Sequence, residues 1–123
     1  MIFRYARHTT NLNLIEKFYI EIVGLKKLGG FEGHDNYDGI FLGIPGESWH
    51  LEFTTSPDKP ESRFDEDDAL VFYANNETEL TDIKKHLKRQ DVRLETPKNP
   101  YWQENGIMIA DPDGFKIIFS IKP

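Results

Sequence analysis

The chain has 123 residues, enough for one domain that buries about two thirds of the surface exposed by its unfolded form. Its 21 acidic and 15 basic residues give a net charge of −6, so the basic field of a nucleic-acid or anionic-membrane binder is missing. The absence of cysteine excludes disulfides, thiolate metal sites and a cysteine nucleophile. No apolar run suits a signal peptide or a span of ~20 residues, so we expect a cytoplasmic protein without nucleic-acid or membrane partners.

The first half predicts a strand, a helix and then further strands. Residues 2–9 (IFRYARHT) have strand character, and apolar residues at helical spacing follow Asn13, which stands three positions before Glu16 in the manner of a capping pair. Gly24 is expected to end this helix. Residues 39–53 (GIFLGIPGESWHLEF) then predict two strands around a Pro-Gly turn.

The second half repeats this order. A strand at residues 69–74 (ALVFYA) precedes the capping pair Asn76 and Glu79 and a helix with one apolar stripe. A strand is expected at residues 92–96 (VRLET), and residues 106–119 (GIMIADPDGFKIIF) repeat the two-strand pattern of the first half. The sequence therefore predicts two modules, residues 1–55 and 68–123, joined by a charged linker at residues 56–67.

The final strand carries an unexplained apolar residue. Asp-Pro-Asp-Gly at residues 111–114 is strong turn chemistry, and alternation after it places Lys116, Ile118 and Ser120 on one strand face. Ile118 thus stands between two polar neighbours on a face that the pattern predicts to be polar.

Three segments in this order resemble a known family: FYIEIVGLKKLGGF, WHLEFTT and DPDGFKIIF. The chain is similar to the vicinal oxygen chelate superfamily, which groups glyoxalase I, extradiol dioxygenases, fosfomycin-resistance enzymes and bleomycin-resistance proteins. The resemblance implies an α+β fold of two βαβββ modules around a U-shaped cleft, and often a homodimer. In metal-dependent members, His and Glu side chains from the first and last strand of each module hold a divalent ion there.

The match is poor at the positions of the metal ligands. They fall on Arg4, Glu52, a residue near Asp68, and Ile118. A guanidinium has no lone pair for a metal, and Ile118 offers only hydrocarbon. Our leading hypothesis is that Arg4 and Glu52 form a charge-assisted pair where relatives hold the ion, and that Arg4 recognises an anionic group on a ligand. The alternative is a purely structural ion pair.

A different metal arrangement remains open. Alternation places His8 on the same face of the first strand as Arg4, and His50 on the same face of its strand as Glu52. His8, His50 and Glu52 are therefore an alternative ligand set for Zn, Ni, Mn or Fe. Histidines on strands are also often simply packed or hydrogen-bonded, so we favour no metal.

Aromatic residues before a late strand are further candidates for ligand binding. Tyr101 and Trp102 lie in residues 98–106 (KNPYWQENG), and large aromatic side chains beside a cleft suit flat or apolar ligands. The alternative is that Trp102 belongs to the core.

Two classes of function follow. The first is a small-molecule binding protein of the bleomycin-resistance type, which the missing metal ligands favour. The second is an enzyme, either a glyoxalase I-like lyase or an extradiol-dioxygenase-like protein, with Glu52 as metal ligand or base. A metal-free enzyme with Glu52 as base and Arg4 stabilising negative charge is a third, weaker hypothesis.

Overall fold

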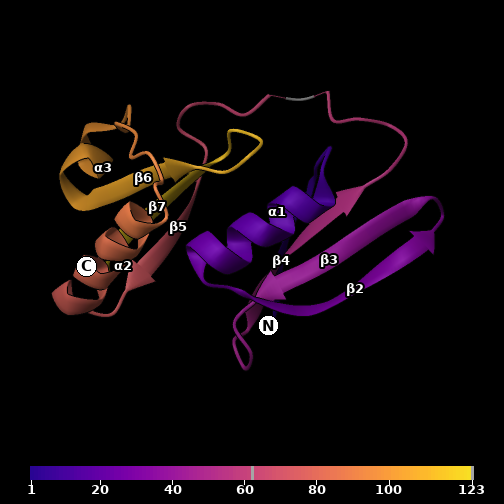
Figure 1. Cartoon of the computed structure of the whole chain (residues 1–123), viewed down its shortest axis with the longest axis horizontal. Helices are drawn as coiled ribbons and strands as arrows, with labels where there is room; N and C mark the ends of the chain where they lie inside the picture. Colours follow the sequence, from indigo (N-terminus) through magenta and orange to yellow (C-terminus); the bar gives the residue numbers. More distant parts are fainter. Residues whose placement is uncertain (62, 123) are drawn as a thin grey trace. The chain divides into compact units, whose positions relative to one another are not determined.

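The structure is a computed structural model that describes residues 1–61 and 63–122. It consists of two compact units, residues 1–62 and 63–123, and each is considered by itself. Each unit holds one sheet and a helix that packs on it (Figure 1). The boundary between the units falls between the last strand of the first module and the first strand of the second.

The first unit is a four-stranded sheet with a helical segment on one face (Figure 1). The strands lie in the order β1-β4-β3-β2, with β1 parallel to β4 and the other neighbours antiparallel. A two-residue turn with positive φ at Asp35 and Asn36 joins β2 to β3, as tight hairpins require. The elements are β1 (Phe3–His8), α1 (Leu12–Phe18), a π-helical turn η1 (Tyr19–Val23), β2 (Lys26–His34), β3 (Tyr37–Gly43) and β4 (Trp49–Thr55).

Helix α1 begins two residues earlier than its sequence suggested. Asn11 is its N-cap, because the Asn11 side chain accepts a hydrogen bond from the Leu14 N–H at 3.0 Å. The predicted pair of Asn13 and Glu16 is therefore wrong, and Glu16 instead binds Lys27 of β2 at 3.2 Å. The predicted end is confirmed: Gly24 caps the segment with a φ of 92°, a conformation that glycine adopts without strain.

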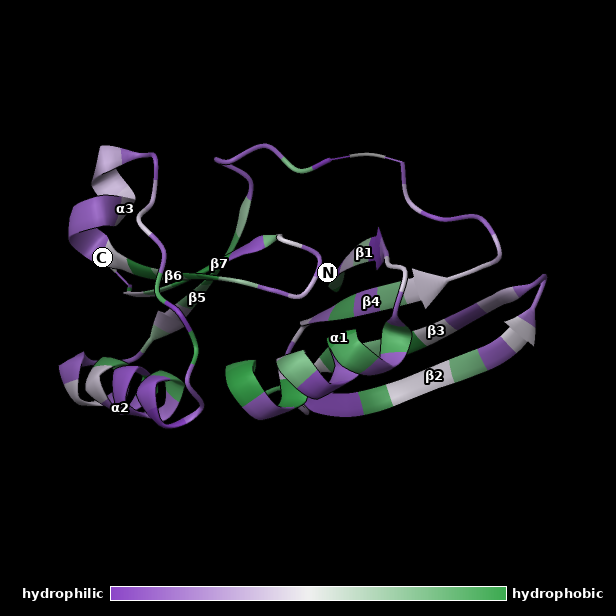
Figure 2. Ribbon diagram, turned by 45° about the horizontal axis from the view of Figure 1, so that its top comes forward, coloured by the Kyte–Doolittle hydropathy of each residue, from purple (hydrophilic) through white to green (hydrophobic). Residues whose placement is uncertain are grey.

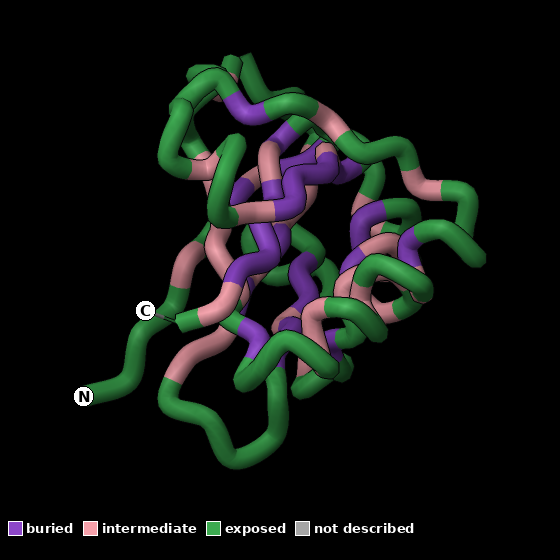
Figure 3. Tube along the Cα trace, turned by 90° about the vertical axis from the view of Figure 1, so that its left-hand side faces the viewer, coloured by how far each residue is buried: buried purple, intermediate pink, exposed green. Residues whose placement is uncertain are grey.

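The core of the first unit lies between α1 and one face of its sheet. The rings of Tyr19 and Phe53 pack with their centroids 4.7 Å apart, and both side chains are almost completely buried. Each large apolar side chain buried in this way contributes about 1.5–3 kcal/mol. Figure 3 shows such buried stretches along strands and helices, with exposed loops between them. The other core members are Ile15, Leu25, Ile40, Leu42 and Leu51.

The second unit repeats the arrangement with a smaller sheet. Its strands lie in the order β5-β7-β6, with β5 parallel and β6 antiparallel to β7. The central strand β7 and its neighbour β6 are strongly hydrophobic, whereas α2 carries many hydrophilic residues (Figure 2). The elements are β5 (Ala69–Ala74), α2 (Glu77–Arg89), α3 (Pro100–Asn105), β6 (Gly106–Ala110) and β7 (Lys116–Ile121).

The cap of α2 confirms the sequence prediction. The Asn76 side chain accepts a hydrogen bond from the Glu79 N–H at 2.9 Å, and the Glu79 carboxylate accepts one from the Asn75 N–H at 2.8 Å. Two N–H groups at the start of the helix region are thereby satisfied by one Asn and Glu pair.

Two elements of the second unit differ from expectation. The strand predicted at residues 92–96 is reduced to one bridge, in which the Glu95 N–H donates to the Met108 carbonyl at 2.8 Å. Pairing cannot continue past it because Pro97 has no N–H. Helix α3 was not predicted, although Asn99 at its N-cap and Pro100 in its first turn are typical start signals. The α+β fold of two βαβββ modules is otherwise confirmed.

In the described ranges, every helix is too short or too polar to cross a membrane.

The turn before β7 is organised by a buried carboxylate. Asp111 is only 5% exposed, and its Oδ1 accepts hydrogen bonds from the N–H groups of Asp113 (2.8 Å) and Phe115 (3.0 Å). Gly114 closes the turn with a φ of 89° and donates its N–H to the Asp111 carbonyl at 2.9 Å. The predicted turn chemistry is thus confirmed, and the Asp111 side chain determines the direction in which β7 leaves the turn.

Replacing the two candidate cap residues of α1 tests the corrected start of the helix. Asn11→Ala should lower the free energy of unfolding by about 1 kcal/mol, because it leaves the Leu14 N–H without its acceptor. The melting temperature should fall by about 3–5 °C. Asn13→Ala is the matched control and should change stability by less than about 0.5 kcal/mol. An equal or larger loss in Asn13→Ala would restore the original prediction.

Replacing Asp111 tests the turn. Asp111→Ala should destabilise the chain by about 2–4 kcal/mol in urea unfolding, because two backbone N–H groups lose a buried acceptor. Asp111→Asn keeps an oxygen at Oδ1 and should lose less than half as much unfolding free energy as Asp111→Ala. Equal losses in the two variants would show that the negative charge, and not the acceptor geometry, stabilises the turn.

Candidate functional site

The distal face is defined here as the face of the first sheet that points away from α1. Leu51 and Phe53 of β4 point toward α1, so alternation directs His50 and Glu52 to the distal face. The register of β1 on β4 places Arg4 beside His50 and Ala6 beside Glu52. Three predicted site residues, Arg4, His50 and Glu52, are therefore brought together on neighbouring strands.

The predicted ion pair of Arg4 and Glu52 is present. Arg4 Nη1 lies 3.3 Å from Glu52 Oε2, and the side chains are 49% and 16% exposed, respectively. The Arg4 guanidinium also lies 5.6 Å from the centre of the Phe41 ring, within the range of a cation–π contact. An ion pair with one half-exposed partner contributes only about 0.2–1 kcal/mol to folding. Its main physical effect is to balance the charge of the more buried Glu52.

A row of rings continues from Arg4 across the distal face. Phe41 meets His50 edge to face at a centroid distance of 5.7 Å, and Phe31 lies 6.0 Å beyond Phe41. Phe31 covers Gly39 so closely that a Cβ there would come within 2.5 Å of the Phe31 ring. Sequence reasoning missed Phe31 and Phe41, because only the register of the strands places Phe41 beside Glu52 and Phe31 beside Gly39.

His8 and His50 differ in their surroundings. The two ring nitrogens of His8 are engaged: Nδ1 lies 2.8 Å from Thr54 Oγ1, and Nε2 lies 3.0 Å from both Ser56 Oγ and the Asp58 carbonyl. Because a carbonyl only accepts, Nε2 carries a proton and donates. The His8 side chain therefore binds the segment that follows β4. His50, in contrast, makes its one ring contact among the described residues with Phe41.

The residues present do not fit the divalent ion of metal-dependent relatives. Within residues 1–61 and 63–122, no group of three His, Asp or Glu side chains is arranged to hold a metal. His8 is committed to three hydrogen-bond partners, and Glu52 is shared with the Arg4 guanidinium. Asp68 lies in a turn, where its Oδ2 accepts from the Asp65 N–H at 3.2 Å.

The second sheet explains why the apolar Ile118 stands between two polar residues. Lys116 Nζ binds Glu95 Oε1 at 2.6 Å, and Ser120 Oγ donates to the Asn105 carbonyl at 2.5 Å. Ile118 lies between them, 2% exposed, and its Cγ2 would be 2.7 Å from a Cβ at Gly106. The polar neighbours of Ile118 are thus bound by partners within the unit, and Ile118 itself is core.

Tyr101 and Trp102 lie on α3 of the second unit. Trp102 is half-buried and would be 3.2 Å from a Cβ at Gly106, so it packs against the start of β6. Tyr101 is 52% exposed and meets Trp102 edge to face at 4.8 Å. A role for either residue in ligand binding stays a prediction.

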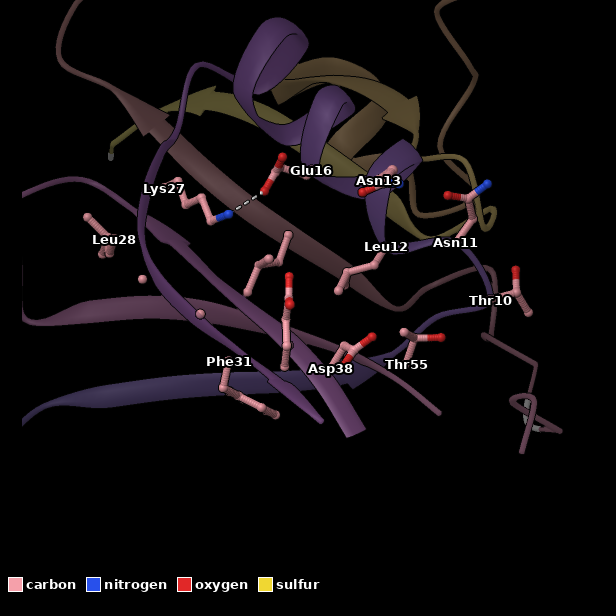
Figure 4. A pocket seen from close by; sticks show the side chains of 15 residues that line it. Thr10, Asn11, Leu12, Asn13, Glu16, Lys27, Leu28, Phe31, Asp38 and Thr55 are labelled. Carbon is pink, nitrogen blue, oxygen red and sulfur yellow. Dashed lines mark ion pairs between the residues drawn. The ribbon is translucent and has the colours of Figure 1, made fainter. Parts of the chain in front are cut away.

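A groove of about 960 Å³ lies on the other side of the first sheet, between α1 and the β2–β3 hairpin (Figure 4). None of the six residues predicted to bind ligand lines it, and sequence reasoning did not anticipate it. The available signal was the pair Gly29 and Gly30, because adjacent glycines in a strand leave a sheet face without side chains. Its polar and charged lining residues are Thr10, Asn11, Asn13, Glu16, Lys27, Glu32, Asp38 and Thr55.

Comparison with known proteins gives clear matches over both units. Residues 3–54 match the YycE-like N-terminal domain, and residues 67–120 match the YycE-like C-terminal domain. The chain is 40% identical over 117 residues to the uncharacterized protein YycE of Bacillus subtilis, covering 94% of this chain and 84% of YycE. The crystal structure of a Bacillus subtilis YycE protein, described as a putative glyoxalase/fosfomycin resistance protein, matches with a TM-score of 0.85 and 38% identity over 98% of this chain and 88% of that one.

More distant structures share the fold. Leishmania major glyoxalase I matches with a TM-score of 0.76 and 19% identity, over 98% of this chain and 86% of that one. TnmS3, an antibiotic binding protein from Streptomyces, matches with a TM-score of 0.73 and 18% identity, over 100% and 96%. The chain therefore belongs to the YycE-like family and has the fold of the glyoxalase and bleomycin-resistance proteins of the vicinal oxygen chelate superfamily.

Proposed function

We propose that the chain is a small-molecule binding protein that takes an organic anion with a flat apolar part on the distal face. In this proposal the Arg4 guanidinium supplies the positive charge that a divalent ion supplies in metal-dependent relatives. The observation that carries it is the ion pair of Arg4 and Glu52, 3.3 Å long, with the guanidinium beside the Phe41 ring.

The geometry of Arg4 supports recognition of an anion. Only Nη1 of Arg4 binds Glu52, and the remaining guanidinium N–H groups have no hydrogen-bond partner among the described residues. The distance of 3.3 Å exceeds the about 2.7–2.9 Å of a strong charge-assisted bond, so the pair is loose. A ligand carboxylate or phosphonate can therefore bind the guanidinium in a two-point fork without first breaking a tight contact.

The rings beside Arg4 support a flat ligand. Phe31, Phe41 and His50 form a continuous row, and aromatic side chains favour stacked or edge contacts with another ring. His50 also has two ring nitrogens without a hydrogen-bond partner in the described part of the chain, so it can orient a polar substituent. An aromatic carboxylate can bind the Arg4 guanidinium with its charge and contact the row of rings with its own ring.

Binding without chemistry agrees best with the side chains present. Of the relatives, TnmS3 is named an antibiotic binding protein and the Leishmania protein a glyoxalase I. Within residues 1–61 and 63–122, no group of three His, Asp or Glu side chains offers the donor set of a metal-dependent lyase or dioxygenase. The alternative enzyme would use Glu52 as its base, and one observation favours it: Glu52 Oε1 has no hydrogen-bond partner among the described residues.

Three probes with one phenyl ring each test the proposal: phenylacetate, neutral 2-phenylethanol and the 2-phenylethylammonium ion. In a two-dimensional NMR titration, phenylacetate should shift the amide signals of Arg4, Phe41 and His50 more than the other two probes do. Arg4→Gln should weaken phenylacetate binding about tenfold, because the charge-assisted bonds are lost. Arg93→Gln, an exposed arginine in the second unit, is the matched control.

Glu52→Gln tests whether Glu52 competes with the ligand for Arg4. If Arg4 recognises the anion, removing the neighbouring carboxylate should strengthen phenylacetate binding by about two- to fivefold, because a competing and repelling charge disappears. Weaker binding in Glu52→Gln, or an unchanged affinity in Arg4→Gln, would contradict the proposal.

Homodimerisation stays a prediction, and light scattering on the purified chain measures it.

A further inference from the structure

The groove lies on the side of the first sheet opposite to the distal face, and it is independent of the proposed function. Its floor includes Ile40 and Thr55, which share with Phe53 the sheet face that α1 covers. Its wall is α1, joined to β2 by the bond between Glu16 and Lys27 (Figure 4). A ligand in the groove and a ligand beside Arg4 would therefore be separated by the sheet itself.

The course of the backbone leaves space for the groove. Helix α1 packs on β3 and β4 and leaves β2 at the rim. On β2, Gly30 has no side chain, and a Cβ there would come within 2.7 Å of the Gly39 carbonyl oxygen. A larger residue at Gly30 would force the strands apart, so this position leaves its part of the groove without a side chain. Leu12 and Ile40 supply apolar surface to the groove.

The lining carries uncompensated negative charge. Three carboxylates line the groove, Glu16, Glu32 and Asp38, against the single ammonium group of Lys27. Lys27 is bound to Glu16, whereas Glu32 and Asp38 have no cationic partner among the described residues. Among the residues that the structure describes, the Asp38 side chain accepts one hydrogen bond, from the Gly33 N–H at 2.8 Å.

The two unpaired carboxylates both belong to the hairpin of β2 and β3. Phe31 pairs with Gly39, so Glu32 and Asp38 are the adjoining residues on the same side of that pair. Like charges on neighbouring strands repel each other, and a cation bound beside them lowers that repulsion. Thr55, the register partner of Asp38 on β4, adds a hydroxyl oxygen on the groove floor.

We propose that this groove binds a small organic cation with an apolar body. The ammonium group lies between Asp38 and Glu32 and donates hydrogen bonds to their carboxylates, and the body lies against Leu12 and Ile40. The groove selects against anions, which Arg4 on the opposite face attracts.

The 2-phenylethylammonium ion tests this site on the whole chain. In an NMR titration at low ionic strength it should shift the amide signals of Leu12, Glu32, Asp38 and Ile40, and leave Arg4 and Glu52 unchanged. Neutral 2-phenylethanol should bind more weakly by about fivefold, the upper limit for one exposed charge contact. Raising the salt to about 0.15 M should reduce that difference, because exposed charges are then screened.

Variants that keep the shape of the groove assign the effect to its charges. The double variant Asp38→Asn with Glu32→Gln should weaken binding of the ammonium probe about fivefold or more, since both charges are lost. Asn at position 38 still has an oxygen for the Gly33 N–H, so the hairpin should remain folded. Glu47→Gln, a carboxylate of the β3–β4 turn outside the groove, should leave affinity unchanged.

The results that would refute the cation groove differ from those that would refute the anion site. Equal affinity for 2-phenylethanol and its ammonium analogue, no loss in the double variant, or shifts confined to the distal face would refute the cation groove. Arg4→Gln should not weaken ammonium binding, whereas it should weaken phenylacetate binding. The two sites therefore succeed or fail separately.

Discussion

The parallel register of β1 on β4 is the constraint on which the candidate site depends. It places Arg4 beside His50 and Ala6 beside Glu52, so one cation reaches one carboxylate across the strand pair. A slip of one residue would send Arg4 to the face covered by α1, where Tyr19 and Phe53 pack, and away from Glu52. The apolar core on one side of the sheet therefore fixes the charge pair on the other.

The first sheet separates two polar regions of different character. Its distal face presents a half-exposed guanidinium beside a row of rings, whereas the groove under α1 presents two carboxylates without a cationic partner in the described residues. The chain as a whole is acidic, and the charge of Arg4 is balanced by Glu52.

Some of these features could be predicted from sequence because they depend on spacing within one segment. The repeat between residues 39–53 and 106–119, the Asn76 and Glu79 cap, and the shared face of His50 and Glu52 are of this kind. The contributions of Phe31 and Phe41 to the site could not be predicted from sequence, because they depend on the register between strands. The start of α1 was misplaced for a related reason: Asn11 and Asn13 are both good caps, and only the path of the chain after β1 decides between them.

The central claim is that Arg4 takes the place of the divalent ion, and metal binding tests it most directly. Protein purified without chelator is dialysed against Zn²⁺, Ni²⁺, Mn²⁺ or Fe²⁺, and bound metal is measured by mass spectrometry for the native chain and for Glu52→Gln. The account predicts well under one ion per chain, with no difference between the two proteins. One ion per native chain that is lost in Glu52→Gln would contradict it.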